Sequence, residues 1–175
     1  MNVLEEINEK LDQIIKEEKL GKGFQFRTGQ RETITAICKT YFEDPKAPIV
    51  IDAPTGTGKS IIAMASSLVL SGFDKQGYLI TSDLSLQDQY ESDFYRLGLH
   101  WPSVKGADNY ECSVNNLPFS LGDCRLKGMG YEQASKLDCY ASCDYLQNRQ
   151  RAINHRVCLL NYAFWLLQRN YVEDK

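Results

Sequence analysis

The chain has 175 residues, of which 43% are hydrophobic and 25% are charged, and its formal net charge is −3. This length allows one domain with a hydrophobic core, and this composition excludes a disordered chain. The small negative charge excludes a protein coated by nucleic acid over its whole surface, although it allows a local basic groove.

The first 50 residues contain two predicted helices and one predicted strand. Residues 1–20 place leucines and isoleucines at helical spacing between charged residues, which predicts an N-terminal amphipathic helix. A second helix is expected around Cys38, which we interpret as a small core residue. The apolar run Pro48–Ile51 then predicts a buried strand.

The segment after this run reads A-P-T-G-T-G-K-S and predicts a phosphate-binding loop at the start of a helix. Its glycines allow a tight turn whose N–H groups face phosphate oxygens. Its lysine can reach the β- and γ-phosphates of ATP, and its serine hydroxyl can coordinate Mg²⁺. The predicted nucleotide-binding residues are Ala53, Pro54, Thr55, Gly56, Thr57, Gly58, Lys59 and Ser60, with Lys59 and Ser60 as the catalytic pair.

Strands and helices are predicted to alternate through most of the remaining chain, which indicates an α/β fold with a parallel sheet covered by helices on both faces. Cys158 lies in the last predicted strand and is interpreted as core. The predicted strands are Gly77–Ser82, Trp101–Lys105 and Val157–Asn161, and the predicted helices are Leu86–Gly98, Asp144–Arg156 and Tyr162–Arg169.

The alternation fails between Gly106 and about Cys143, where apolar residues are sparse and lack a clear period. Such a segment buries too little surface to offset its ordering entropy. Four cysteines lie in it with the spacing C-x11-C-x14-C-x3-C, and a metal centre held by their thiolates would supply the missing stability. The spacing leaves zinc and an iron–sulfur cluster equally open. The predicted metal ligands are Cys112, Cys124, Cys139 and Cys143.

The N-terminal residues and the lengths of the apolar runs predict the cellular location. The acidic N-terminus does not resemble a secretion signal, and no run of about 18 apolar residues could span a membrane. We therefore expect an intracellular protein without a membrane partner, cytoplasmic or, in a eukaryote, nuclear. Disulfide pairing of the cysteines is disfavoured there.

The order of these motifs resembles the XPD/DinG-like iron–sulfur DNA helicases of superfamily 2. Arg27 and Gln30 match the family's R-x-x-Q element, which lies near the adenine. The phosphate-binding loop is similar to helicase motif I, in which alanine replaces the first glycine. The resemblance implies a RecA-like motor domain that binds ATP and Mg²⁺, with a 4Fe–4S cluster preferred over Zn²⁺ at the cysteines.

The same resemblance implies contacts with single-stranded and duplex DNA. Thr81 and the Leu86–Gln89 segment resemble motif Ia, which lines the DNA path, and the Lys105–Cys112 segment resembles the start of the cluster domain. The helix after Cys143 is the clearest basic concentration, with a solvated helix face as the alternative. The predicted DNA-binding residues are Thr81, Gln87, Gln89, Lys105, Arg149 and Arg151.

Two departures from the family pattern limit what the 175 residues are expected to do. Tyr162 stands where the family has histidine, and no D-E-x-H element occurs, so ATP hydrolysis is expected to be inefficient without C-terminal helicase domains in the same or a separate chain. The alternatives are a zinc-stapled nucleic-acid-binding module on a P-loop scaffold, or a P-loop ATPase of another class. The expected divisions are an N-terminal helix (1–20), the first part of motor domain 1 (21–105), a cluster insertion (106–148) and the return to motor domain 1 (149–175).

Overall fold

The computed structural model describes residues 2–17 and 20–166. The chain forms two compact units, which are considered separately below. Unit 1 comprises Met1–Leu79 and Ser92–His100, and unit 2 comprises Ile80–Glu91 and Trp101–Lys175. Among the described residues, no helix combines the length and apolar character that crossing a bilayer requires.

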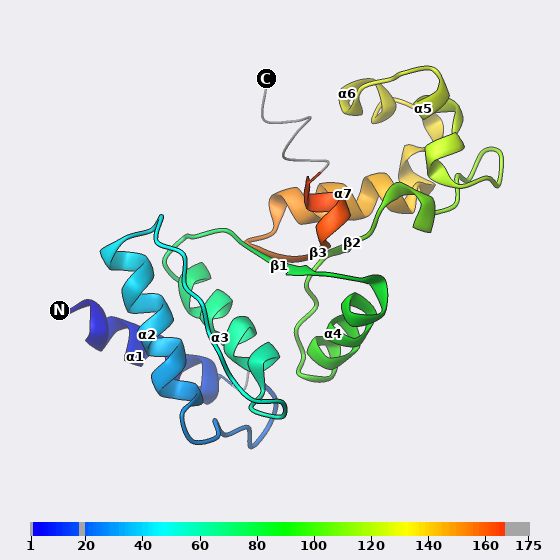
Figure 1. Ribbon diagram of the computed structural model, residues 1–175. Coiled ribbons are helices and arrows are strands. Elements are labelled where there is room, and N and C mark those ends of the chain that lie inside the picture. The colour runs from blue at the N-terminus through cyan, green and yellow to red at the C-terminus, as the bar shows by residue number, and fades with distance from the viewer. Residues whose placement is uncertain (1, 18–19, 167–175) are drawn as a thin grey trace. The chain divides into compact units, whose positions relative to one another are not determined.

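Three helices that pack against one another form most of unit 1 (Figure 1). The first begins where the Asn2 side chain accepts a hydrogen bond from the Leu4 N–H, while the Glu5 carboxylate accepts one from the Asn2 N–H. This capping box, followed by buried Ile7 and Leu11, confirms the predicted amphipathic helix. The helices are α1 (Val3–Lys16), α2 (Gln30–Glu43) and α3 (Lys59–Ser71).

The predicted strand Pro48–Ile51 is wrong in this structure. These residues have no strand pairing, and Val50 is 91% exposed. An apolar run is suited to a sheet, but it becomes a strand only where another strand supplies hydrogen-bond partners. The described part of the chain supplies none for this run, so its aliphatic side chains face solvent.

The other predicted strands do form a sheet, in the order β1-β3-β2. Strand β2 pairs in parallel with β3, with Ser103 opposite Leu159 and Val104 opposite Leu160. All five residues of β3 are buried, as expected for a parallel strand covered on both faces. The strands are β1 (Gly77–Thr81), β2 (Ser103–Val104) and β3 (Val157–Asn161).

Helices flank this parallel sheet, which confirms the predicted α/β class. Helix α4 (Leu84–Arg96) begins at Asp83, whose carboxylate accepts a hydrogen bond from the Leu86 N–H, and this bond lowers the pKa of Asp83. Helix α7 (Asp144–Asn154) packs against β2, and residues 162–166 are helical after β3. The apolar residues between them form the sheet core: Val104, Ala152, Cys158, Leu160 and Phe164.

The cysteine-rich segment consists of short helical turns, in agreement with its lack of sequence periodicity. The turns enclose a second small core, the cysteine core, made of Phe119, Cys124, Ala134, Cys143 and Leu146. Four partly buried tyrosines pack against this core: Tyr110, Tyr131, Tyr140 and Tyr145. The turns are η1 (Ala107–Asn109), η2 (Phe119–Leu121), α5 (Asp123–Leu126), α6 (Tyr131–Ala134) and η3 (Asp138–Ser142).

Candidate functional site

The phosphate-binding loop lies in unit 1 and runs directly into α3. Gly56 and Gly58 have φ angles of 81° and 79°, a left-handed conformation that glycine adopts without steric cost. Gly58 is the N-cap residue, so Lys59 and Ser60 occupy the first turn of a 13-residue helix. The free N–H groups and positive dipole end of this turn favour a bound phosphate.

Lys59 lies against the loop that precedes it. Its Nζ donates hydrogen bonds to the carbonyl oxygens of Ala53, at 2.6 Å, and Pro54, at 3.2 Å. The Thr57 hydroxyl donates to the same Pro54 carbonyl at 2.9 Å. The lysine is exposed, so its ammonium group is accessible to a phosphate while these bonds hold the loop in a closed turn.

Arg27 and Gln30 also converge on this loop. The Arg27 guanidinium donates to the Gly56 carbonyl oxygen at 2.9 Å, and the Gln30 amide nitrogen donates to that of Thr57 at 2.8 Å. The Gln30 side-chain oxygen accepts from the Arg27 N–H, which fixes the amide orientation. The structure thus gives this pair a contact with the loop backbone, while its proximity to an adenine stays a prediction.

Gly58 is the loop position with least room for a side chain. A Cβ atom there would stand 2.4 Å from the Gln30 Nε2 atom, whereas a Cβ at Gly56 would meet nothing within 4 Å. We expect Gly58→Ala to lower the free energy of unfolding more than Gly56→Ala does. In both variants, the left-handed backbone conformation costs an alanine about 1–2 kcal/mol. Only Gly58→Ala also displaces the Gln30 side chain. Urea denaturation measures the difference, and equal losses in the two variants would contradict the packing role of Gln30.

The four predicted metal-ligating cysteines gather in one small region of unit 2. Cys112, Cys124 and Cys143 are buried and Cys139 is half-buried, and all are free thiols. Burial raises the pKa of Cys124, and the nearby Cys112 and Cys139 raise it further. Burial likewise raises the pKa of Cys143, with added contributions from Cys124, Cys139 and Cys112. The four sulfurs therefore lie within electrostatic range of one another.

Backbone N–H groups oppose this effect and favour the thiolate form. The Leu146 N–H, in the first turn of α7, bonds to Cys143 and lowers its pKa, and the Arg125 N–H does the same for Cys124. Such amide–sulfur bonds also tune iron–sulfur clusters. In contrast, the described residues contain no group of three or more His, Cys, Asp or Glu side chains arranged to hold a metal ion. The donors are gathered, but not at single-ion spacing.

The remaining two cysteines are core residues, as predicted. Cys38 in α2 and Cys158 in β3 have no exposed surface, and burial raises the pKa of each thiol to about 12. Neither of these two cysteines is among the groups that shift the pKa of Cys124 or of Cys143.

Two of the predicted DNA contacts have buried side chains. Thr81 is 3% exposed, and its hydroxyl donates to the Asp83 carbonyl oxygen. Gln87 has no exposed surface, and its amide nitrogen donates to the Ser103 hydroxyl at 2.9 Å and the Val104 carbonyl at 3.2 Å. Both side chains therefore bond within unit 2, and contact with DNA would require them to move.

The other predicted DNA contacts reach the surface to different degrees. Gln89 and Arg151 are exposed. Lys105 is bonded to the Asp88 carboxylate, and this bond raises the pKa of the lysine. The Arg149 guanidinium carbon stands over the Tyr131 ring, 4.6 Å from its centre. The DNA-binding role of all four stays a prediction. Sequence reasoning did not find Arg125, which lies beside Cys124 and carries no motif signal.

A phosphate-binding loop on the first turn of a helix, in an α/β chain with a parallel sheet, defines the P-loop class of nucleotide-binding proteins. The sequence profile of the family described as "Type III restriction enzyme, res subunit" matches residues 23–153, well over half of the chain. The chain belongs to this family. This family is related to the superfamily 2 helicases, and its members are helicase-like ATP-dependent enzymes that act on nucleic acid. No curated protein and no solved structure matched the chain.

Proposed function

We propose that the chain carries the ATP-binding loop and the cluster segment of a DNA helicase of the XPD/DinG-like iron–sulfur family. The family description names a restriction enzyme subunit, but the gathered cysteines favour the iron–sulfur branch of helicase-like proteins. This convergence of Cys112, Cys124, Cys139 and Cys143, which follow the motif Ia-like segment in the sequence, is the observation that carries the proposal.

The nucleotide-binding part of the proposal rests on the geometry of unit 1. The α3 N-terminus and the Lys59 ammonium group would bind the β- and γ-phosphates, and the Ser60 hydroxyl would coordinate Mg²⁺. Arg27 and Gln30 hold the carbonyl oxygens of Gly56 and Thr57, so the loop N–H groups stay turned to one side. Because the 175 residues contain no D-E-x-H element, we expect ATP binding with little hydrolysis.

The cofactor part rests on the chemistry of the cysteine donors. Four thiols, two of which accept backbone N–H hydrogen bonds, are a suitable donor set for a 4Fe–4S cluster. Such a cluster would cross-link the turns that carry the cysteines and so stabilise the segment. Zinc requires four donors at tetrahedral distances around one ion, and the described residues have no such group. The donor arrangement by itself favours neither metal centre, and the preference for the cluster rests on the resemblance of the motif order to iron–sulfur helicases.

Metal analysis of the chain purified without oxygen tests this proposal. We expect about four iron atoms and four sulfides per chain, with broad visible absorption. The same preparation should bind a fluorescent ATP analogue and a single-stranded oligonucleotide. One zinc ion per chain instead of iron would replace the proposal by the zinc-stapled nucleic-acid-binding module, and a chain without either metal would contradict both.

A further inference from the structure

An ion pair in unit 2 joins helix α4 to the residue that follows strand β2. The Lys105 ammonium group bonds to the Asp88 carboxylate, and 26% of the lysine side chain and 59% of the aspartate side chain are exposed. The motif order predicts that Lys105 binds DNA, whereas Asp88 is not among the predicted contacts. In the free chain, a carboxylate therefore occupies the cation that a phosphate would need.

Hydrogen bonds beside the ion pair hold its two members opposite each other. Gln87 precedes Asp88 and has no exposed surface. Its amide nitrogen donates to the carbonyl oxygen of Val104, the residue before Lys105, at 3.2 Å. The Lys105 N–H donates in turn to the Tyr110 hydroxyl at 3.0 Å. Because these bonds fix the backbone on both sides, the ion pair forms with little further loss of conformational freedom.

Lys105 lies at the carboxyl edge of the parallel sheet. Strand β2 ends at Val104, which pairs in register with Leu160 near the end of β3. Ligands of parallel α/β sheets bind beyond the carboxyl ends of the strands. The family to which the chain belongs acts on nucleic acid, so a strand phosphate is the anion expected at this edge.

The α4 side of Lys105 is acidic. A hydrogen bond to Asp88 raises the pKa of the lysine, and the charges of Asp88 and Glu91 raise it further, while burial lowers it. The part of α4 that belongs to unit 2, residues 84–91, contains two carboxylates and no basic residue. A phosphate at this edge gains the lysine only by displacing the Asp88 carboxylate, and it then lies near that negative charge.

We propose that Asp88 is an internal competitor, which holds Lys105 in the free chain and is displaced from it by a phosphate of single-stranded nucleic acid. The inference rests on the proposed function, because it takes the strand as the ligand of the sheet edge. One anion replaces another at the lysine, and the released carboxylate takes up a cation from solution. The contact therefore positions a strand that other groups hold and adds little to its capture.

Replacement of Asp88 by asparagine tests the competition. Asparagine keeps the size of the side chain and removes its charge, so a phosphate can contact Lys105 without breaking an ion pair. We expect the Asp88→Asn chain to bind a fluorescein-labelled oligothymidylate of about 16 nucleotides about twofold to fivefold more tightly at low salt. The salt slope should become steeper by about 0.7, because the contact then gives a net release of one counterion. Anisotropy at several salt concentrations measures both quantities.

Three further variants complete the test. Asp93→Asn is the matched control, since Asp93 lies on the same helix and pairs with Arg96 at 3.7 Å. It removes the same charge, and its affinity and salt slope should match those of the unmodified chain. In a Lys105→Gln background, Asp88→Asn should leave the salt slope unchanged, because no lysine is freed for the phosphate. Asp88→Ala should repeat the effect of Asp88→Asn, and thermal unfolding establishes that each variant is folded.

The outcomes separate this inference from the proposed function. An unchanged salt slope in Asp88→Asn, or an equal change in Asp93→Asn, would overturn the competition while leaving strand binding by the chain intact. An equal change in the Lys105→Gln background would also overturn it, since Asp88 would then act through its charge alone. If neither the unmodified chain nor any variant bound single strands, both the competition and the nucleic-acid part of the proposed function would fall.

Discussion

Replacement of Lys59 by alanine is expected to weaken ATP binding by the 175-residue chain by at least about tenfold, because a hydrogen bond to a charged group contributes about 1.5–3 kcal/mol. The variant loses the ammonium group that faces the phosphates. It also loses the hydrogen bonds from Lys59 to the carbonyl oxygens of Ala53 and Pro54, so the loop is held less firmly. Titration with a fluorescent ATP analogue measures the change.

A second lysine in unit 1 provides the control for charge. Lys75 is exposed and lies after α3, away from the phosphate-binding loop in sequence. Lys75→Ala removes the same charge, and we expect its ATP affinity to match that of the unmodified chain. Because Lys59 is exposed and its hydrogen bonds lie within the loop, Lys59→Ala should remain folded, which thermal unfolding measures. Unchanged ATP affinity in Lys59→Ala would show that the loop does not bind phosphate.

Replacement of Cys143 by serine is expected to remove the proposed iron–sulfur cluster and to destabilise unit 2 by several kcal/mol, since the free energy of metal binding becomes free energy of folding. Cys143 is the N-cap residue of α7 and belongs to the cysteine core, so its loss affects both the ligand set and the packing of the segment. Iron analysis measures the first effect and thermal unfolding the second.

Two controls separate metal loss from the loss of packing. Serine is itself a favourable N-cap residue, so the difference in unfolding temperature between the metal-free forms of Cys143→Ser and of the unmodified chain measures the loss of packing alone. Cys38→Ala removes a buried thiol from unit 1, and we expect it to retain the full iron content. Full iron content in Cys143→Ser would exclude this residue as a ligand.

The sequence predicted elements whose signal is local. Helix α1 follows from apolar residues at helical spacing, and β3 follows from the apolar run Val157–Asn161. The glycines at 56 and 58 and the following lysine likewise identify the phosphate-binding loop without any tertiary information. In each case, the residues that determine the structure are adjacent in the chain.

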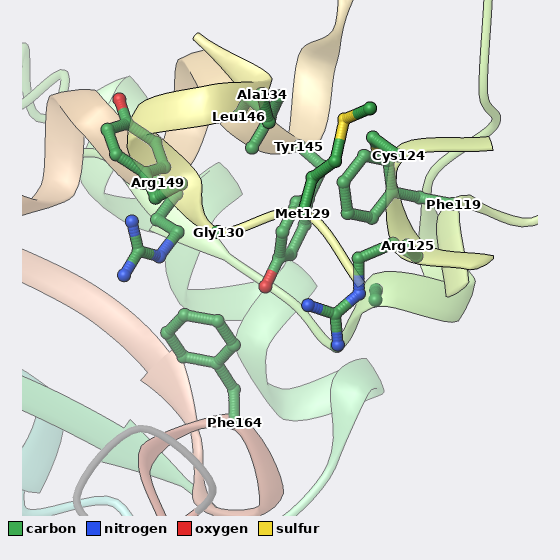
Figure 2. A pocket seen from close by; sticks show the side chains of 13 residues that line it. Phe119, Cys124, Arg125, Met129, Gly130, Ala134, Tyr145, Leu146, Arg149 and Phe164 are labelled. Carbon is green, nitrogen blue, oxygen red and sulfur yellow. The ribbon is translucent and has the colours of Figure 1, made fainter. Parts of the chain in front are cut away.

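The features that the sequence did not predict depend on residues far apart in the chain. The run Pro48–Ile51 has the composition of a strand, but strand formation requires a pairing partner that composition does not reveal. Gln87 has the pattern of an exposed helical residue, and its burial depends on acceptors at Ser103 and Val104. Arg125 and Arg149 line one cavity of unit 2 (Figure 2), although they are 24 residues apart and no sequence motif relates them.

Tyr145 packs against both the sheet core and the cysteine core. Its ring stacks on Phe119 of the cysteine core and touches Phe164 of the sheet core. The two cores therefore share one partly buried side chain, and loosening of either core would expose more of it. Loosening of the cysteine-rich segment would consequently spread into the hydrogen-bonded strands, so that the two regions are expected to unfold as a single cooperative block.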